Sequence, residues 1–221
     1  MEKEYPRISF KNRINSVKDE VENLGQLVIE SHRKAITLLS EYDEKVAEEV
    51  IAQSKEVDEA SFELERKCIK FIAVEQPVAG DLMFIESTIR IDGHIKRIGY
   101  LASNIAELAV LIQDIPVPEK LMEDLQYMAD YVQMMLSKGI YAFLNQNIDM
   151  AKELRKEDDK VDDFFDSILQ QATDAMFEDK ENITEIINII FIARFLERIG
   201  DRAVSIGRRT IFMLTFERPK N

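Results

Sequence analysis

Apolar residues recur along most of this chain at the three- and four-residue spacing of an amphipathic helix. Leu24, Leu27 and Val28 share one face in the first such stretch, and Leu38 and Leu39 continue it. Side chains at this spacing meet on one side of a helix, so this face is expected to be buried. No segment shows the strict alternation of apolar and polar residues that marks a half-buried strand. The pattern therefore predicts an all-α protein.

Six helical segments are expected. Gln76-Pro77 ends the second segment, because proline lacks a backbone N–H and disfavours helix at the preceding residue. Helices of roughly 30 residues are about 45 Å long at 1.5 Å per residue. The connections between them are short, so neighbouring helices should be antiparallel. The expected helices cover residues 8–40, 43–74, 81–113, 119–145, 148–178 and 182–214.

The chain carries an internal duplication. Residues 47–58 align with residues 151–162 at an offset of 104 positions, and residues 96–105 align with residues 197–206 at an offset of 101. The second alignment pairs KRIGYLASNI with ERIGDRAVSI. A repeat of this length favours two similar halves, each of three helices, in one compact body.

Two glycines recur at equivalent places in the repeat. Gly99 and Gly200 both fall in the middle of an expected helix, where Gly costs about 1 kcal/mol relative to Ala. Their recurrence predicts that a neighbouring helix approaches closely at both positions. The most economical architecture is two tandem three-helix bundles joined near residues 116–118, the first covering residues 1–115 and the second residues 118–221.

The two copies differ in a spaced acidic signature that is complete only in the second. There Asp158 and Asp162 lie four residues apart, as do Glu197 and Asp201, so each pair shares one helix face. Like charges at this spacing destabilise a helix, and a cation such as Fe, Mn, Mg or Zn would relieve the repulsion through oxygen ligands. The alternative is a solvated acidic face, since the chain has 42 Asp and Glu residues. The equivalent positions of the first copy hold Ser54, Asp58, Lys96 and Tyr100.

The composition argues against several classes of protein. A formal net charge of −13 repels nucleic acid, because binding there depends on Lys and Arg neutralising phosphates. Cys68 is the only cysteine, which fits a reducing compartment. The N-terminal sequence lacks the apolar core of a secretory signal, and the longest apolar stretch, residues 183–193, falls short of a membrane span. We expect a soluble, cytoplasmic protein that is peripheral to a membrane at most.

Other candidate chemistry is weaker. His32 and His94 are the only histidines, and neither follows a Glu at the Glu-x-x-His spacing of di-iron sites. Both are expected on helix surfaces, and Cys68 is expected in the core. No Gly-rich phosphate loop occurs. Four arginines near the C-terminus are expected to stabilise the end of the last helix, or else to form a docking patch. These are Arg202, Arg208, Arg209 and Arg218.

Three short segments carry a family resemblance. Residues 76–82 (QPVAGDL) resemble a QPVAxDLR segment, with Met83 in place of its Arg, and residues 196–201 reproduce the signature LERIGD. Residues 156–162 (KEDDKVD) resemble an acidic motif of the second helix. Together with the order of the duplication, these segments make the chain similar over nearly its whole length to the PhoU family of phosphate-signalling regulators.

The resemblance implies two three-helix bundles, often dimeric, with iron or zinc clusters held on each bundle's surface by E/D-x-x-x-D motifs. It also implies a role without catalysis, in which the protein restrains the phosphate-starvation response. The implied partners are the ATPase of the phosphate ABC transporter and the sensor histidine kinase at the membrane. The implied metal ligands of the second bundle are Asp158, Asp162, Glu197 and Asp201.

The first copy departs from the family pattern. With Ser54, Lys96 and Tyr100 at the other positions, Asp58 is its single carboxylate, and one carboxylate beside an ammonium group cannot hold a multinuclear metal site. Iron or zinc is therefore expected in the second bundle only. We expect the Lys96 ammonium to reach Asp58 and to stand where a cation would have been, with Tyr100 covering the adjacent surface. The alternative is that Lys96 points freely into solvent.

These observations favour a non-enzymatic regulator and adaptor of phosphate uptake signalling that forms a homodimer. The alternative is a carboxylate-bridged metalloenzyme with its site between the fifth and sixth helices, at Asp158 and Glu197. Such an enzyme would need an open coordination position and a nearby general acid or base, and no His stands in the signature segments. A third possibility is a transporter-associated paralogue that has drifted from phosphate.

Overall fold

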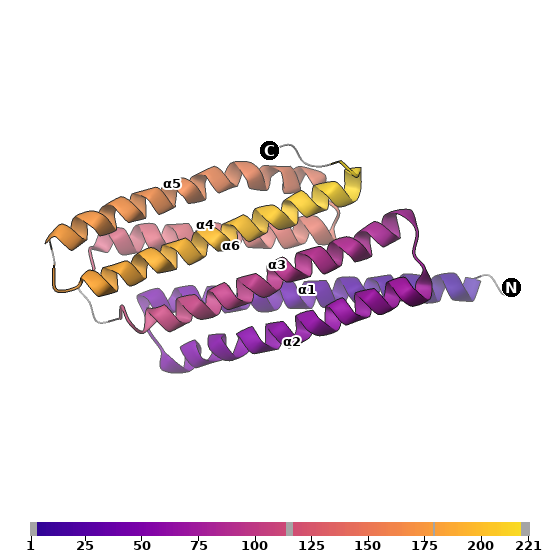
Figure 1. The fold of residues 1–221 in the computed structure, drawn as a ribbon, viewed down its shortest axis with the longest axis horizontal. Coiled ribbons are helices and arrows are strands. Elements are labelled where there is room, and N and C mark those ends of the chain that lie inside the picture. Colours follow the sequence, from indigo (N-terminus) through magenta and orange to yellow (C-terminus); the bar gives the residue numbers. More distant parts are fainter. Residues whose placement is uncertain (1–3, 114–116, 179, 218–221) are drawn as a thin grey trace.

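Six long helices account for almost all of the chain that the structure describes. The structure is a computed structural model, and it describes residues 4–113, 117–178 and 180–217. All six helices run along the long axis of the molecule (Figure 1), and no strand occurs in these ranges, which confirms the all-α prediction. The helices are α1 (Glu4–Ser40), α2 (Glu44–Glu75), α3 (Ala79–Ala109), α4 (Glu119–Leu144), α5 (Ile148–Glu178) and α6 (Ile183–Thr215).

The helix ends follow the local sequence, with one clear difference. α2 ends where expected, because Gln76 adopts a left-handed conformation (φ 46°) and its N–H bonds to the Ile72 carbonyl. α3 ends at Ala109, before the predicted residue 113. The Leu111 N–H there bonds to the carbonyl three residues back, at 3.0 Å, so the chain tightens into a turn and the helix stops.

The two halves of the chain pack against each other through four central helices. The contacts between the halves are those of α1 with α4 and of α3 with α6. α2 lies outside against α1 and α3, and α5 lies on the opposite side against α4 and α6 (Figure 1). Within each half the three helices all contact one another, so the predicted pair of three-helix bundles is confirmed.

One apolar core runs through both bundles. Its buried residues come from all six helices and form a single continuous cluster, with Val17 of α1, Leu136 of α4 and Ile206 of α6 among its fully buried members. Removal of apolar surface from water is the main favourable term in folding. Each half therefore stabilises the other.

Parts of two predictions lie outside the described residues. The proposed domains, residues 1–115 and 118–221, meet at a junction whose residues 114–116 are not described, so these limits remain predictions. Arg218 of the predicted arginine patch also lies outside the described residues.

The duplication is visible in repeated contacts between helices. Lys34 of α1 pairs with Glu49 of α2 at 3.0 Å, and Lys138 of α4 pairs with Glu153 of α5 at 2.8 Å. The second pair lies 104 positions after the first, which is the offset of the sequence repeat. The same helix packing is thus used twice.

The recurrent glycines lie where helices approach closely, as predicted. A Cβ atom at Gly99 of α3 would lie 3.0 Å from the Val57 Cγ1 atom of α2, which is closer than side chains normally pack. A Cβ atom at Gly200 of α6 would lie 3.5 Å from the Cγ1 atom of Val161 in α5. Val57 and Val161 are themselves equivalent in the repeat, so one contact occurs in both bundles.

The expectation that both histidines lie on helix surfaces is wrong. His32 is fully buried, and its neighbours include Gln133 of α4 in the other half of the chain. Burial lowers the pKa of His32 to about 4, because a charged imidazolium would lose its hydration there. His94 is half-buried between α3 and α6. Cys68 is buried in the core, as predicted.

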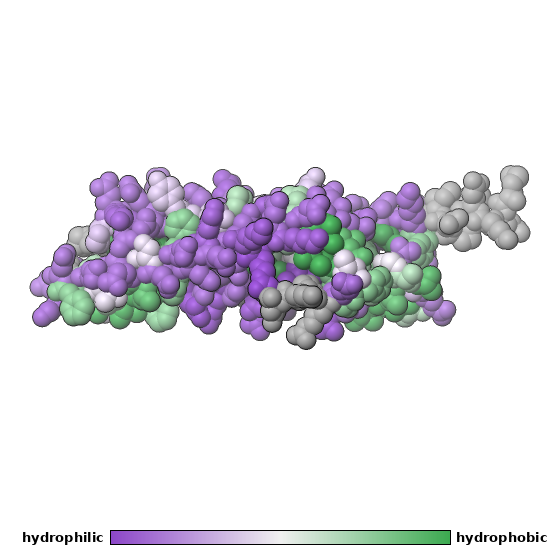
Figure 2. All heavy atoms as spheres, turned by 90° about the horizontal axis from the view of Figure 1, so that it is seen from above, coloured by the Kyte–Doolittle hydropathy of each residue, from purple (hydrophilic) through white to green (hydrophobic). Residues whose placement is uncertain are grey.

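The face of the molecule seen in Figure 2 is mainly polar. Figure 2 shows a face that is hydrophilic over most of its length, with hydrophobic residues gathered toward its edges. None of the helices in the described part of the chain is long and apolar enough to cross a membrane.

Candidate functional site

The four acids of the second copy, here called the acidic cluster, lie on the outer surface of the second bundle. Asp158 and Asp162 belong to α5, and Glu197 and Asp201 belong to α6. Val161 of α5 lies between Asp158 and Asp162 in the sequence, and Gly200 of α6 lies between Glu197 and Asp201. Val161 packs against Gly200, so the two pairs of acids lie side by side. Asp162 and Asp201 are exposed, whereas Asp158 and Glu197 are half-buried.

Burial and mutual repulsion raise the pKa values of Asp158, Asp162 and Glu197 in the acidic cluster. Burial raises the pKa of Asp158 to about 6, and the charges of Asp201 and Asp162 add to this shift. Burial also raises the pKa of Asp162, again with help from Asp201. The pKa of Glu197 is raised by burial and by both neighbouring Asp charges, although Arg194 opposes the shift. The structure therefore brings the four predicted carboxylates close enough to repel one another, which favours a proton or a cation among them.

Arg194 forms a hydrogen bond and an ion pair with Glu197 of the acidic cluster. Its Nη1 atom donates to Glu197 Oε1 at 2.6 Å. The same guanidinium lies over the ring of Phe165 in α5, 5.5 Å from the ring centroid. Arg194 thus neutralises part of the cluster's charge from one side.

The donor atoms of the acidic cluster suit a hard cation, but they do not already surround one point. Within the described residues, no group of three or more His, Cys, Asp or Glu side chains is arranged to hold a metal ion. The carboxylates would have to turn toward one another, and Glu197 would have to leave Arg194. Carboxylate oxygens also bind iron and zinc, and binding of either metal stays a prediction.

The equivalent positions of the first copy form an ion pair. The Lys96 ammonium pairs with Asp58, as expected, and the Tyr100 hydroxyl donates to Asp58 Oδ1 at 3.0 Å. The hydrogen bond from Lys96 and then that from Tyr100 hold the pKa of Asp58 below its usual value. The Ser54 hydroxyl is buried and donates to the Ile51 carbonyl at 2.8 Å, so it is used within its own helix.

Sequence reasoning missed a buried acid in the first bundle. Asp92 of α3 is 4% exposed, and it accepts a hydrogen bond from the Ser61 hydroxyl of α2 at 2.8 Å. Burial raises the pKa of Asp92 to about 6, against the effect of Ser61. One signal was present in the sequence, because Asp92 lies on the helix face that Ile85 and Ile95 mark as apolar.

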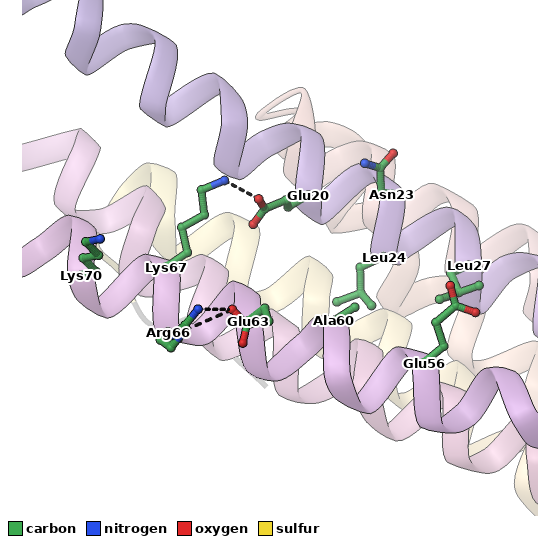
Figure 3. Close-up of a pocket in the computed structure, with 10 residues that line it drawn as sticks. All are labelled: Glu20, Asn23, Leu24, Leu27, Glu56, Ala60, Glu63, Arg66, Lys67 and Lys70. Atoms are coloured by element: carbon green, nitrogen blue, oxygen red, sulfur yellow. Dashed lines mark hydrogen bonds and ion pairs between the residues drawn. The ribbon is translucent and has the colours of Figure 1, made fainter.

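A cleft between α1 and α2 is lined by both charged and apolar residues. It has a volume of about 670 Å³, and Leu24 and Ala60 point toward each other across it (Figure 3). Four of the charged groups around it are paired, Lys67 with Glu20 across the helices and Arg66 with Glu63 along α2.

Sequence similarity to known proteins extends over the whole chain. Residues 21–109 and 125–210 each match the PhoU domain. The chain is 57% identical over 219 residues to the phosphate-specific transport system accessory protein PhoU homolog 1 of Methanothermobacter thermautotrophicus, covering 99% of this chain and 100% of that protein. It is 30% identical over 197 residues to the phosphate-specific transport system accessory protein PhoU of Escherichia coli, covering 89% and 81%.

Solved structures share the fold. The crystal structure of PhoU from Pseudomonas aeruginosa aligns with a TM-score of 0.89 at 26% identity, covering 94% of this chain and 100% of that one. The phosphate transport system regulatory protein PhoU from Streptococcus pneumoniae aligns with a TM-score of 0.88 over 96% and 100% of the two chains. At 23% identity, the second alignment is evidence for the fold alone.

Proposed function

Because this chain belongs to the PhoU family of phosphate-transport accessory proteins, we propose that it is a cytoplasmic, non-catalytic regulator of phosphate uptake. In this role it is an adaptor between the ATPase of the phosphate ABC transporter and the sensor histidine kinase of the phosphate-starvation response. The observation that carries the proposal is 57% identity, over essentially the full length of both chains, to a protein named as a phosphate-transport accessory protein. A homodimer is part of the same proposal.

The acidic cluster is the proposed cation site of this regulator. Asp158, Asp162, Glu197 and Asp201 would hold iron or zinc through carboxylate oxygens, and the bound cation would supply positive charge that offsets their repulsion. Neutralised in this way, the outer face of the second bundle would lose a local excess of negative charge. This change gives a partner a metal-dependent surface to recognise.

No specific observation favours the metalloenzyme alternative. Neither α5 nor α6 contains a histidine, so the cluster has no imidazole for acid–base catalysis on these helices. Arg194, a cation beside the cluster, pairs with Glu197. Relatives that align over most of the chain are named as accessory proteins of transport.

A pull-down tests the adaptor role. The tagged full-length protein is incubated with the phosphate transporter ATPase and the partner kinase of the same organism, and with the ATPase of an unrelated ABC transporter as control. We expect capture of at least one of the first two and not of the control. Failure with both, together with phosphate-ester hydrolysis that Glu197→Gln abolishes, would favour the enzyme.

A further inference from the structure

A groove lined with arginines lies between α3 and α6, where the two halves of the chain meet. It has a volume of about 620 Å³. No Asp or Glu of the described residues lines it, although the chain carries a net charge of −13. Its lining residues, here called the arginine groove, are Arg90, Gly93, His94, Arg97, Arg202, Ser205, Arg208, Arg209 and Phe212.

Two of the five arginines are held by a neighbouring acid. Glu86 of α3 pairs with Arg209 of α6, and it also accepts from the Arg90 Nε atom at 3.0 Å. The Arg209 Nε atom donates to the Ser87 hydroxyl at 3.0 Å, and its guanidinium lies 4.7 Å from the ring centroid of Phe212. These contacts fix one end of the groove and leave its net charge positive.

None of the acids that the structure describes holds the other three arginines in this way. Among the described residues, no carboxylate forms an ion pair with Arg97, Arg202 or Arg208. The Arg202 Nε atom is buried and makes no hydrogen bond. Arg202 also faces His94, whose pKa is lowered by burial and then by the Arg202 charge. A buried donor without an acceptor is costly, so this part of the groove favours an anion that supplies one.

Guanidinium groups in this arrangement suit phosphate groups. Arginine presents a planar set of N–H donors that binds phosphate oxygens in pairs, and it is the preferred side chain for this purpose. Arg90 and Arg97 are seven residues apart on one helix, a rise of about 10 Å. That length exceeds one phosphate group and accommodates several in a row.

We propose that the arginine groove binds a compact ligand that carries several linked phosphate groups. This ligand class includes inorganic condensed phosphates and nucleoside triphosphates, which share a chain of phosphoanhydride groups. The inference rests on the groove itself and goes beyond the adaptor role. Arg208 lines the groove and also acts electrostatically on Asp158 of the acidic cluster, so the ligand site and the proposed cation site lie next to each other on α6.

Gly93 provides a test that leaves the fold intact. A Cβ atom at this position would have no atom within 4 Å, so a longer side chain fits and projects from the groove wall. The Gly93→Glu variant places a carboxylate among the arginines, and Gly93→Gln is the neutral control of the same shape. Tripolyphosphate, ATP and inorganic phosphate are titrated by calorimetry at physiological ionic strength, where weak surface attraction is screened.

We expect the wild type and Gly93→Gln to bind tripolyphosphate or ATP more tightly than inorganic phosphate, and Gly93→Glu to bind at least tenfold more weakly. The Arg202→Gln/Arg208→Gln variant should lose binding similarly, whereas Arg66→Gln, on α2 outside the groove, should not. A preference between tripolyphosphate and ATP identifies the source of the phosphate chain. Absence of binding to all three probes, equal binding by Gly93→Glu, or binding of an acidic peptide alone would overturn the proposal. The pull-down above is scored separately, so failure of either proposal leaves the other standing.

Discussion

Asp58 and Asp162 occupy equivalent positions in the repeat, yet their neighbours give them opposite properties. Lys96 and Tyr100 hold the pKa of Asp58 down, whereas burial and nearby carboxylates raise the pKa of Asp162. The first bundle thus provides its own counter-charge from the side chain of Lys96. In the second bundle the carboxylates repel one another, and the pairing of Arg194 with Glu197 offsets only part of their charge. Substitutions at three positions account for this difference, while the surrounding helix packing is the same.

At the scale of single residues, the metal proposal predicts that the metal content of the protein depends on the acids of the second copy alone. The Asp162→Asn/Glu197→Gln variant, purified without chelator, should contain at least tenfold less iron and zinc than the wild type, because two of the four carboxylates become neutral amides. Elemental analysis measures this directly. The matched control is Asp58→Asn, which should leave the metal content unchanged. Equal metal in the wild type and the double variant would show that the acidic cluster holds no cation.

The buried Asp92 predicts a pH dependence of stability. Its folded pKa of about 6 lies above the ordinary value of 3.8, so the folded state binds more protons between these pH values. Stability from this group is therefore present below pH 3.8 and is lost as the pH rises through about 6. At about 1.4 kcal/mol per pKa unit, the loss is about 1–3 kcal/mol.

The Asp92→Asn variant tests this dependence, because its amide does not titrate. From pH 3.5 to pH 7, we expect the unfolding free energy of the variant to rise relative to that of the wild type by about 1–3 kcal/mol. Urea unfolding at several pH values measures it, and Asp43→Asn, at the exposed start of α2, is the control. A difference that stays constant with pH would contradict a raised pKa.

At the scale of helices, the outer helix of each bundle is held by a valine that packs onto a glycine. The fit is tighter in the first bundle, where a Cβ at Gly99 would lie 3.0 Å from Val57, than in the second, where the distance from Gly200 to Val161 would be 3.5 Å. Two effects compete when either glycine becomes alanine. Helix propensity gains about 1 kcal/mol, and the new methyl group needs space.

The two alanine variants should therefore differ in sign. Gly200→Ala should raise the unfolding free energy by about 0.5–1 kcal/mol, because its methyl group makes an ordinary contact. Gly99→Ala should lower it by up to about 1 kcal/mol, because Val57 must move. Urea denaturation of each variant measures both. A higher unfolding free energy for Gly99→Ala than for Gly200→Ala would mean that the helix contact at Gly99 is not the tighter of the two.

At the scale of the whole molecule, four central helices join the bundles through one core. A Cβ at Gly25 of α1 would lie 2.9 Å from Ile140 of α4, which shows how closely these helices approach across the halves. His32 is buried at the same interface, beside Gln133. The arginine groove also exists only because α3 and α6 lie side by side.

A shared core predicts that the halves do not fold independently. Residues 118–221 produced alone should bind a hydrophobic dye and should lack a sharp thermal transition, because the faces of α4 and α6 that α1 and α3 cover would be exposed. Mixing with residues 1–117 should restore the transition. Circular dichroism measures the transition, with the full chain as control. An isolated half that melts as sharply as the full chain, at the same temperature, would show two autonomous domains.

The sequence by itself determined the features that depend on near neighbours along the chain. Hydrophobic spacing and proline positions located the six helices, because the helix period decides which residues share a face. The offset of the repeat located the two bundles and the recurrent glycines. It also placed Lys96 opposite Asp58, because equivalent helices pack in the same way.

Only the tertiary structure decided which surfaces face one another across the halves. The spacing of residues on a helix defines its faces but does not say which other helix covers each of them. For this reason His32 was expected on the surface and is buried, and Asp92 was not recognised as a core residue. The arginines of α6 were visible in the sequence, but Arg90 and Arg97 of α3 join them only because the duplicated bundles meet along these two helices.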